Sequence, residues 1–296
     1  MIPQIRDWIG ARREELLVAS FMFPMLVMLV TFQLIPTLWA IWFSFTDMAL
    51  VGKSFLHPSF LGLRNFEKIA NDSVFRTSLS VTFEYCSVSL IWRFALGLIM
   101  SLYLTSKLFQ GKKIMAAIFL LPWIIPGVLR PYVWMSILDT RHGIANRLLQ
   151  ALDLPQQSWV YKRAMESVIA INTWSGYAFA MLVLASALKS IPEEYYEIAE
   201  VYGASRWYKL SRITLPLIKF PLILSIILIF KEDIDDFAYV YMLTDGGPHY
   251  RTELLSLYAY HQAFAYYELG YGCAVGVIIA AIVFILSLAQ LRFIRL

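Results

Sequence analysis

SVIAINTWSGYAFAMLVLASAL, residues 167–188, is a run without a single charged residue. A second charge-free run, Leu16–Thr46, is longer still. Apolar runs of 18 or more residues are typical of helices that cross a lipid bilayer. The chain as a whole agrees, because 59% of its 296 residues are hydrophobic and 16% are charged, whereas soluble domains carry about 25% charged residues. The sequence therefore predicts an all-α integral membrane protein.

Six membrane-spanning segments fit the sequence, each near the roughly 20 residues that cross about 30 Å of hydrocarbon. The fifth is the least regular, because Lys231, Glu232 and Asp233 directly follow its apolar part. Together the six form a transmembrane domain at 17–291, with an N-terminal segment at 1–16 and a tail at 292–296. We expect the spans at residues 17–43, 79–104, 114–138, 166–188, 218–240 and 271–291.

Basic residues in the short loops predict the orientation, since Lys and Arg concentrate on the cytoplasmic side. With the N-terminus inside, the cytoplasmic parts hold more bases than the longer outer loops. Both termini are therefore expected in the cytoplasm. The bases are dispersed along the chain rather than clustered, which argues for topology and against binding of nucleic acid.

No catalytic or metal-binding constellation stands out. Gly52-Lys53-Ser54 resembles the end of a phosphate-binding loop, but the motif needs a glycine where Asp47 stands. The four histidines form no close ligand pair, and no nucleophile elbow occurs. We expect no enzyme activity, no bound cofactor and no metal in this chain.

The segment between the fourth and fifth spans, 189–217, is charged and helix-prone. Its acids come early and its bases late, an order that suits a helix dipole. Ile198, Val201 and Tyr202 share a face at i, i+3 and i+4 that could enter an apolar groove on a partner. Gly203 could turn the chain between two short helices. By periodicity alone, an amphipathic linker resting on the membrane surface fits equally well.

Six residues of this loop follow the spacing E-x-A-x3-G-x9-I-x-L-P. The pattern resembles the EAA cytoplasmic loop by which the membrane subunits of ABC importers grip their ATPase. It departs where Ile198 replaces an alanine and Tyr202 replaces a common aspartate. The resemblance implies an ATPase-coupling role for Glu197, Ala199, Gly203, Ile213, Leu215 and Pro216.

Other motifs extend the resemblance over roughly residues 60–291. Gly62-Leu63-Arg64-Asn65-Phe66 is similar to the GL-x-N-Y/F entry to the second span of carbohydrate permeases. Leu243-Thr244-Asp245-Gly246-Gly247-Pro248 resembles the LT-x-GGP signature of the first permease in sugar importers. The resemblance implies a maltose-type importer in the inner membrane of a bacterium. Its permease would be a bundle of six spans with EAA coupling helices on the cytoplasmic side.

The resemblance also implies partners. These would be a second homologous permease, two ATPase subunits that use ATP and Mg²⁺, and an extracytoplasmic solute-binding protein. The chain would form half of the pathway for a carbohydrate, and the membrane lipid would surround it. ATP hydrolysis would lie wholly in another chain.

In the maltose-type branch, the fourth and fifth spans hold the sugar near the middle of the membrane. Carried over by position, this points to Asn172, Thr173, Gly176, Glu232, Asp233 and Asp236. Charges inside spans are functional candidates in their own right. The acids could accept hydrogen bonds from sugar hydroxyls, or they could form internal ion pairs with Lys231 or Arg130. Arg93 is expected to bond inside the bundle.

Two questions stay open at this level. The intramembrane bases favour an anionic solute, such as a uronic-acid oligosaccharide or a phosphorylated polyol, but the neighbouring acids favour a neutral one equally. The alternative function is a secondary transporter driven by an ion gradient, with proton or sodium sites among the acids of the fifth span. Such a carrier needs no ATPase-docking loop, and a membrane-embedded enzyme would need a metal or nucleophile set.

Overall fold

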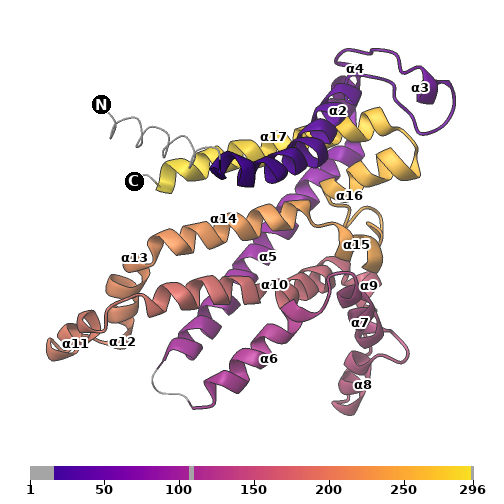
Figure 1. Ribbon diagram of the computed structural model, residues 1–296. Helices are drawn as coiled ribbons and strands as arrows, with labels where there is room; N and C mark the ends of the chain where they lie inside the picture. The colour runs from indigo at the N-terminus through magenta and orange to yellow at the C-terminus, as the bar shows by residue number, and fades with distance from the viewer. Residues whose placement is uncertain (1–16, 107–109, 295–296) are drawn as a thin grey trace, which may run out of the picture. The chain divides into compact units, whose positions relative to one another are not determined.

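The computed structural model describes residues 17–106 and 110–294, with side chains described as far as residue 288. These residues form helices joined by loops (Figure 1), and an isolated antiparallel bridge pairs Thr46 with Phe60. The all-α membrane fold predicted from the sequence is confirmed. The predicted N-terminal segment 1–16 and residues 295–296 of the predicted tail lie outside the described residues.

Four described helices are long and apolar enough to cross a membrane, judged by length and composition. They are Leu17–Phe43, α5 (Ser73–Thr105), α10 (Ala164–Lys189) and Leu269–Leu288, the greater part of α17 (Leu269–Ile294). Two bent pairs also qualify: Lys112–Ile124 with Leu129–Leu138, bent by 101°, and Arg206–Leu217 with Lys219–Asp235, bent by 73°. Six spans result if each bent pair crosses as one, so the number six stays a prediction.

The third predicted span is broken where its prolines lie. It divides into α6 (Lys112–Ile124) and α7 (Leu129–Leu138), with Pro122 near the end of α6 and Pro126 in the break. Proline lacks the backbone N–H that an α-helix needs and its ring crowds the preceding turn. The break therefore follows from the sequence, although the predicted range 114–138 treated the segment as continuous.

The fifth predicted span, 218–240, ends earlier as a helix. α14 covers Lys219–Asp235, and α15 (Ala238–Leu243) starts after an interruption at Asp236. The carboxylate of Asp236 accepts a hydrogen bond from the backbone N–H of Ala238 at 3.1 Å. Aspartate side chains that bond to nearby backbone in this way compete with the helix ladder.

The chain divides into two compact units. The first contains the described residues up to Ile69 together with His261–Ile278. In it, the buried amide of Asn65 donates to the carbonyls of Ser44 at 2.8 Å and Thr46 at 2.9 Å, which fixes the chain leaving the first helix. Its shorter elements are η1 (Val30–Leu34), α2 (Ile35–Phe43), α3 (Lys53–Leu56), α4 (Arg64–Asn71) and η3 (His261–Ala265).

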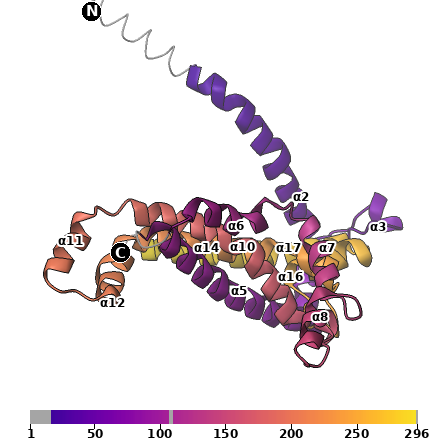
Figure 2. The ribbon, with the colours of Figure 1, turned by 90° about the horizontal axis from the view of Figure 1, so that it is seen from below.

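The second unit covers Ala70–Tyr260 and Ile279 onward. Besides α5, α6, α7, α10, α14 and α15, it contains α8 (Ile144–Ala151), α9 (Trp159–Lys162), α11 (Glu194–Val201), α12 (Arg206–Tyr208), η2 (Lys209–Thr214), α13 (Leu215–Leu217) and α16 (Leu255–Tyr260). α11 and α12 project beyond the end of α10, next to α13 (Figures 1 and 2). Outside the spans, Asp139 accepts backbone N–H bonds from His142 and Arg141, which lowers the pKa of its carboxyl.

α10 is the central helix of the second unit, packed against α5, α6 and α14. In its most apolar stretch 72% of the residues are buried, against 22% in α5. Helices that are apolar on all sides are typical of such a central position. Ile171, Ala178, Met181 and Leu184 of this helix are fully enclosed. The buried polar residues of α10, among them Asn172, Thr173 and Ser175, consequently face other helices and not lipid.

α5 and α10 approach closely at Gly97. A Cβ atom at this position would lie 2.5 Å from the Cβ of Ala180 and 3.0 Å from the backbone of Met181. Small residues at such crossings let helix backbones pack without a gap, which is how helices associate in lipid. The contact brings the polar residues of the two helices into register.

Gly97→Val should therefore destabilise the helix pair, since overpacking costs about 1–3 kcal/mol. The matched control is Gly276→Val in α17, where a Cβ meets nothing within 4 Å. We expect a lower melting temperature in detergent for Gly97→Val and a near-unchanged one for Gly276→Val. Equal melting temperatures for the two variants would contradict the close packing.

Candidate functional site

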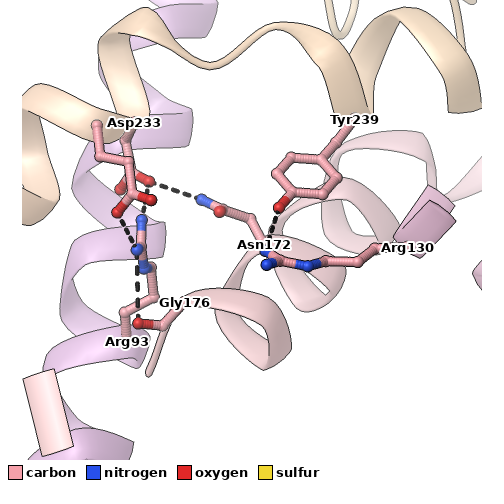
Figure 3. Close-up of polar contacts among 7 residues, drawn as sticks. Arg93, Arg130, Asn172, Gly176, Asp233 and Tyr239 are labelled. Carbon is pink, nitrogen blue, oxygen red and sulfur yellow. Dashed lines mark hydrogen bonds and ion pairs between the residues drawn. The ribbon is translucent and has the colours of Figure 1, made fainter. Parts of the chain in front are cut away.

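A polar cluster lies inside the second unit where α5, α10 and α14 meet (Figure 3). Its centre is Arg93 of α5, whose side chain is 1% exposed. The guanidinium donates through Nη1 to Oδ1 of Asp233, which is 0% exposed, and through Nη2 to Oε2 of Glu232 at 2.5 Å. A buried charge requires such partners, because leaving it unpaired costs several kcal/mol.

α10 completes the cluster from the opposite side. The amide of Asn172 donates to Oδ1 of Asp233 at 2.8 Å, and the carbonyl of Gly176 lies 3.5 Å from Nη2 of Arg93. A Cβ at position 176 would lie 2.1 Å from Nε of Arg93 and 2.2 Å from its Cζ. Gly176 therefore leaves the space in which the guanidinium lies flat against the α10 backbone.

The sequence left open ion pairs between the acids of the fifth span and either Lys231 or Arg130, but neither base pairs with the buried Asp233. Lys231 lies 3.7 Å from Asp235 on the same helix, at i and i+4. Arg130 donates to the hydroxyl of Tyr239 at 2.7 Å and to the carbonyl of Ile125 at 2.7 Å. The partner of Asp233 and Glu232 is Arg93, because it enters from α5 at the same level. The expectation that Arg93 bonds inside the bundle is confirmed.

The six predicted solute-site residues are placed as follows. Asn172, Gly176, Glu232 and Asp233 all contact one another or Arg93. Thr173 is buried, and its hydroxyl has no hydrogen-bond partner among the described residues. Asp236 lies one turn after Glu232, where it bonds to the start of α15. A solute role for these residues remains a prediction.

The hub of this cluster, Arg93, was expected to bond inside the bundle and was not among the six predicted solute-site residues. A signal was present in the sequence: α5 carries polar residues three or four positions apart, which places them on one face. All are buried, and the hydroxyls of Tyr85 and Ser89 find no partner among the described residues. The stripe consists of Ser78, Thr82, Tyr85, Ser89 and Arg93.

The segment between α10 and α14 forms a second candidate site. Gly203 follows α11 with φ +71°, and nothing lies within 4 Å of a Cβ built there. This left-handed conformation is disfavoured for residues with a side chain, so Gly203 turns the chain as predicted. Ala199 is buried, while Ile198, Val201 and Tyr202 are exposed, the last two by 85% and 86%.

Side chains fix the fold of this segment from within. Lys209 pairs with Glu200 at 2.6 Å, and the hydroxyl of Tyr196 lies 2.9 Å from that of Thr214. A cavity of about 630 Å³ opens between these elements and the ends of α5 and α10. Of the remaining predicted coupling residues, Glu197 and Pro216 are exposed and Ile213 and Leu215 half-buried. The apolar face of α11 is consequently held out from the bundle.

Residues 90–295 match the family described as "Binding-protein-dependent transport system inner membrane component". The chain belongs to this family. It is 31% identical over 281 residues to the trehalose/maltose transport system permease protein MalF of Thermococcus litoralis, covering 93% of this chain and 92% of that one. The diacetylchitobiose uptake system permease protein NgcF of Streptomyces coelicolor is 29% identical over 276 residues, covering 88% and 77%.

The fold agrees with that of a solved permease. A chain in the crystal structure of a bacterial alginate ABC transporter, in complex with an alginate pentasaccharide-bound periplasmic protein, superposes with a TM-score of 0.82. The match covers 96% of each chain at 21% identity. The resemblance to ABC permeases drawn from the sequence motifs is confirmed at the level of family and fold. Among the described residues, no group of three or more His, Cys, Asp or Glu is placed to hold a metal.

The buried pair allows a double-variant test. Arg93→Gln should lower the yield and the thermal stability of the purified protein, because it leaves Asp233 buried without its countercharge, a change worth about 3–5 kcal/mol. Adding Asp233→Asn removes the charge and keeps an acceptor for Asn172, so we expect yield to recover by at least half of the loss. Lys231→Gln, in an exposed pair worth about 0–1 kcal/mol, is the control. Equal yields of the single and the double variant would contradict the pairing of Arg93 with Asp233.

Proposed function

We propose that this chain is one of the two permease subunits of an ATP-driven importer that admits a carbohydrate handed over by a solute-binding protein. Two homologous permeases, two ATPase subunits and the binding protein would make up the complex. The names of the relatives support a sugar as the solute. Both termini and the α11–α13 segment would lie in the cytoplasm.

The observation that carries the importer proposal is the exposed apolar face of α11. Val201, Tyr202 and Ile198 point away from the bundle, although burial of such side chains is worth about 1.5–3 kcal/mol each. Their exposure on a segment that Gly203 and the Glu200–Lys209 pair hold in shape fits a helix that inserts into a groove of a partner. In this proposal Glu197, Ala199, Gly203, Ile213, Leu215 and Pro216 form and support the ATPase contact.

The solute would pass beside the cluster of Asn172, Thr173, Gly176, Glu232, Asp233 and Asp236. α10 contributes from the first half of the helix and α14 from its last turns, and both places lie inside the helix bundle, where unpaired polar groups would cost several kcal/mol. The ion-gradient alternative is weaker. Its acids would have to be available to a proton or sodium ion, whereas Asp233 is already held by Arg93 and Asn172.

The assembly itself can be tested by co-expression with the genes of its partner subunits. A tagged chain should pull down an ATPase and a second permease, and the assembled complex should hydrolyse ATP faster when loaded binding protein is added. The chain alone should hydrolyse none. Uptake of labelled trehalose, maltotriose and diacetylchitobiose into proteoliposomes then screens the solute. Solute uptake that follows an ion gradient and needs no ATP would overturn the proposal.

The coupling segment gives a sharper prediction. Gly203→Val forces a β-branched residue into a left-handed conformation at a cost of about 1–2 kcal/mol or more, so it should lower binding-protein-stimulated ATPase activity at least about tenfold. Gly203→Asn, which tolerates that conformation, is the matched control and should keep most of the activity. Glu197→Ala should act more mildly than Gly203→Val. Wild-type ATPase activity in Gly203→Val, at equal complex yield, would show that the segment does not couple to the ATPase.

A further inference from the structure

The cluster around Arg93 combines a hidden cation with an exposed acid. Arg93 and Asp233 are enclosed, whereas the side chain of Glu232 is 57% exposed although it contacts the same guanidinium. Glu232 lies 13 residues after Lys219, the first residue of α14, and a helix rises about 20 Å over that length. A carboxylate at such a depth does not face hydrocarbon; it faces protein or a wet cavity.

Arg93 is not accessible to a solute anion, because its side chain is 1% exposed. Its Nη1 donates to Asp233 and its Nη2 to Glu232 and the Gly176 carbonyl, while its buried Nε has no partner among the described residues. The absence of a Cβ at Gly176 lets the guanidinium lie close to the α10 backbone. The arginine acts on a solute only through the acid that it holds in place.

The surrounding charges leave the site negative. Arg130 is turned toward the Trp123 and Ile125 carbonyls and the Tyr239 hydroxyl, and Lys231 is paired with Asp235. With those groups set aside, the one guanidinium of Arg93 is paired with two carboxylates, those of Glu232 and Asp233. One negative charge therefore remains uncompensated, and Glu232 is the exposed carboxylate that carries it.

We propose that Glu232 is a solute-contacting carboxylate positioned by Arg93, and that it selects neutral or amine-bearing saccharides against acidic ones such as uronates or sugar phosphates. This inference rests on the proposed transport of a carbohydrate. A carboxylate accepts hydrogen bonds from hydroxyl and ammonium groups. It repels a solute carboxylate or phosphate, because like charges at about 4 Å oppose each other even in water-like surroundings.

Charged thiol reagents test whether the charge at this site is negative, and they do so without knowledge of the solute. Leu228 lies one turn before Glu232 and is exposed, so Leu228→Cys is the reporter, in a full chain with Cys86 and Cys273 replaced by alanine. The chain is co-expressed with its partner subunits in membrane vesicles. The cationic reagent MTSET is compared with the anionic reagent MTSES. For each reagent, the rate of reaction with the cysteine at position 228 is divided by its rate of reaction with free glutathione. We expect MTSET to be favoured at least about fivefold, the size of one unit charge at short range.

Two further variants separate the roles of the residues. Glu232→Gln should reduce the preference to about onefold. Arg93→Gln with Asp233→Asn removes one charge of each sign and, with them, the guanidinium that positions Glu232. The preference should therefore fall toward onefold in vesicles with equal reporter content, and an unchanged preference would show that Arg93 does not position Glu232. An equal or faster reaction with MTSES in the otherwise unchanged chain would overturn the proposal, as would a preference that survives Glu232→Gln.

Failure to react with either reagent would also overturn the proposal, because it would place Glu232 away from the aqueous path. Failure of the proposed carbohydrate transport is distinguishable. It would appear as absence of uptake of all tested saccharides, while the charge preference at Leu228→Cys stayed intact.

Discussion

The enclosed charge of Arg93 is the constraint on which the centre of the second unit depends. A guanidinium inside a bundle of apolar helices must be matched by acceptors from every side, or the bundle loses several kcal/mol. Asp233 and Glu232 supply them from α14, and Asn172 and the Gly176 carbonyl from α10. The three helices are therefore fixed in register by one side chain, and the close contact at Gly97 lies one turn further along α5.

Much of the fold could be predicted from the sequence, because hydropathy and length alone identify membrane helices. The first described helix ends at Phe43, as predicted, and α5, α10 and α17 differ from their predicted ranges by a few residues at their ends. The differences arise where side chains compete with the helix ladder. Pro126 lies where the third span breaks, and Asp236 ends α14 by bonding to the backbone of Ala238. Hydropathy averaged over a window of residues shows neither helix end.

The candidate sites were predictable to different degrees. The α11–α13 segment has its own short-range signals, and the left-handed Gly203 and the exposed face of Val201 and Tyr202 agree with them. The solute-site residues came from a resemblance, and the partner of the acids could not be read from spacing, because Arg93 is separated from Asp233 by 140 positions. Only packing decides that Arg93 lies opposite Asp233 while Arg130 turns to Tyr239.

A structure of the assembled complex, determined by electron cryo-microscopy in lipid at a resolution that shows side chains, tests the central claim most directly. The account predicts that the guanidinium of Arg93 is enclosed between Asp233, Glu232 and the backbone at Gly176, with the free oxygen of Glu232 facing the pathway between two permeases. Density that shows Arg93 projecting into that pathway, with Asp233 bound to another group, would contradict it.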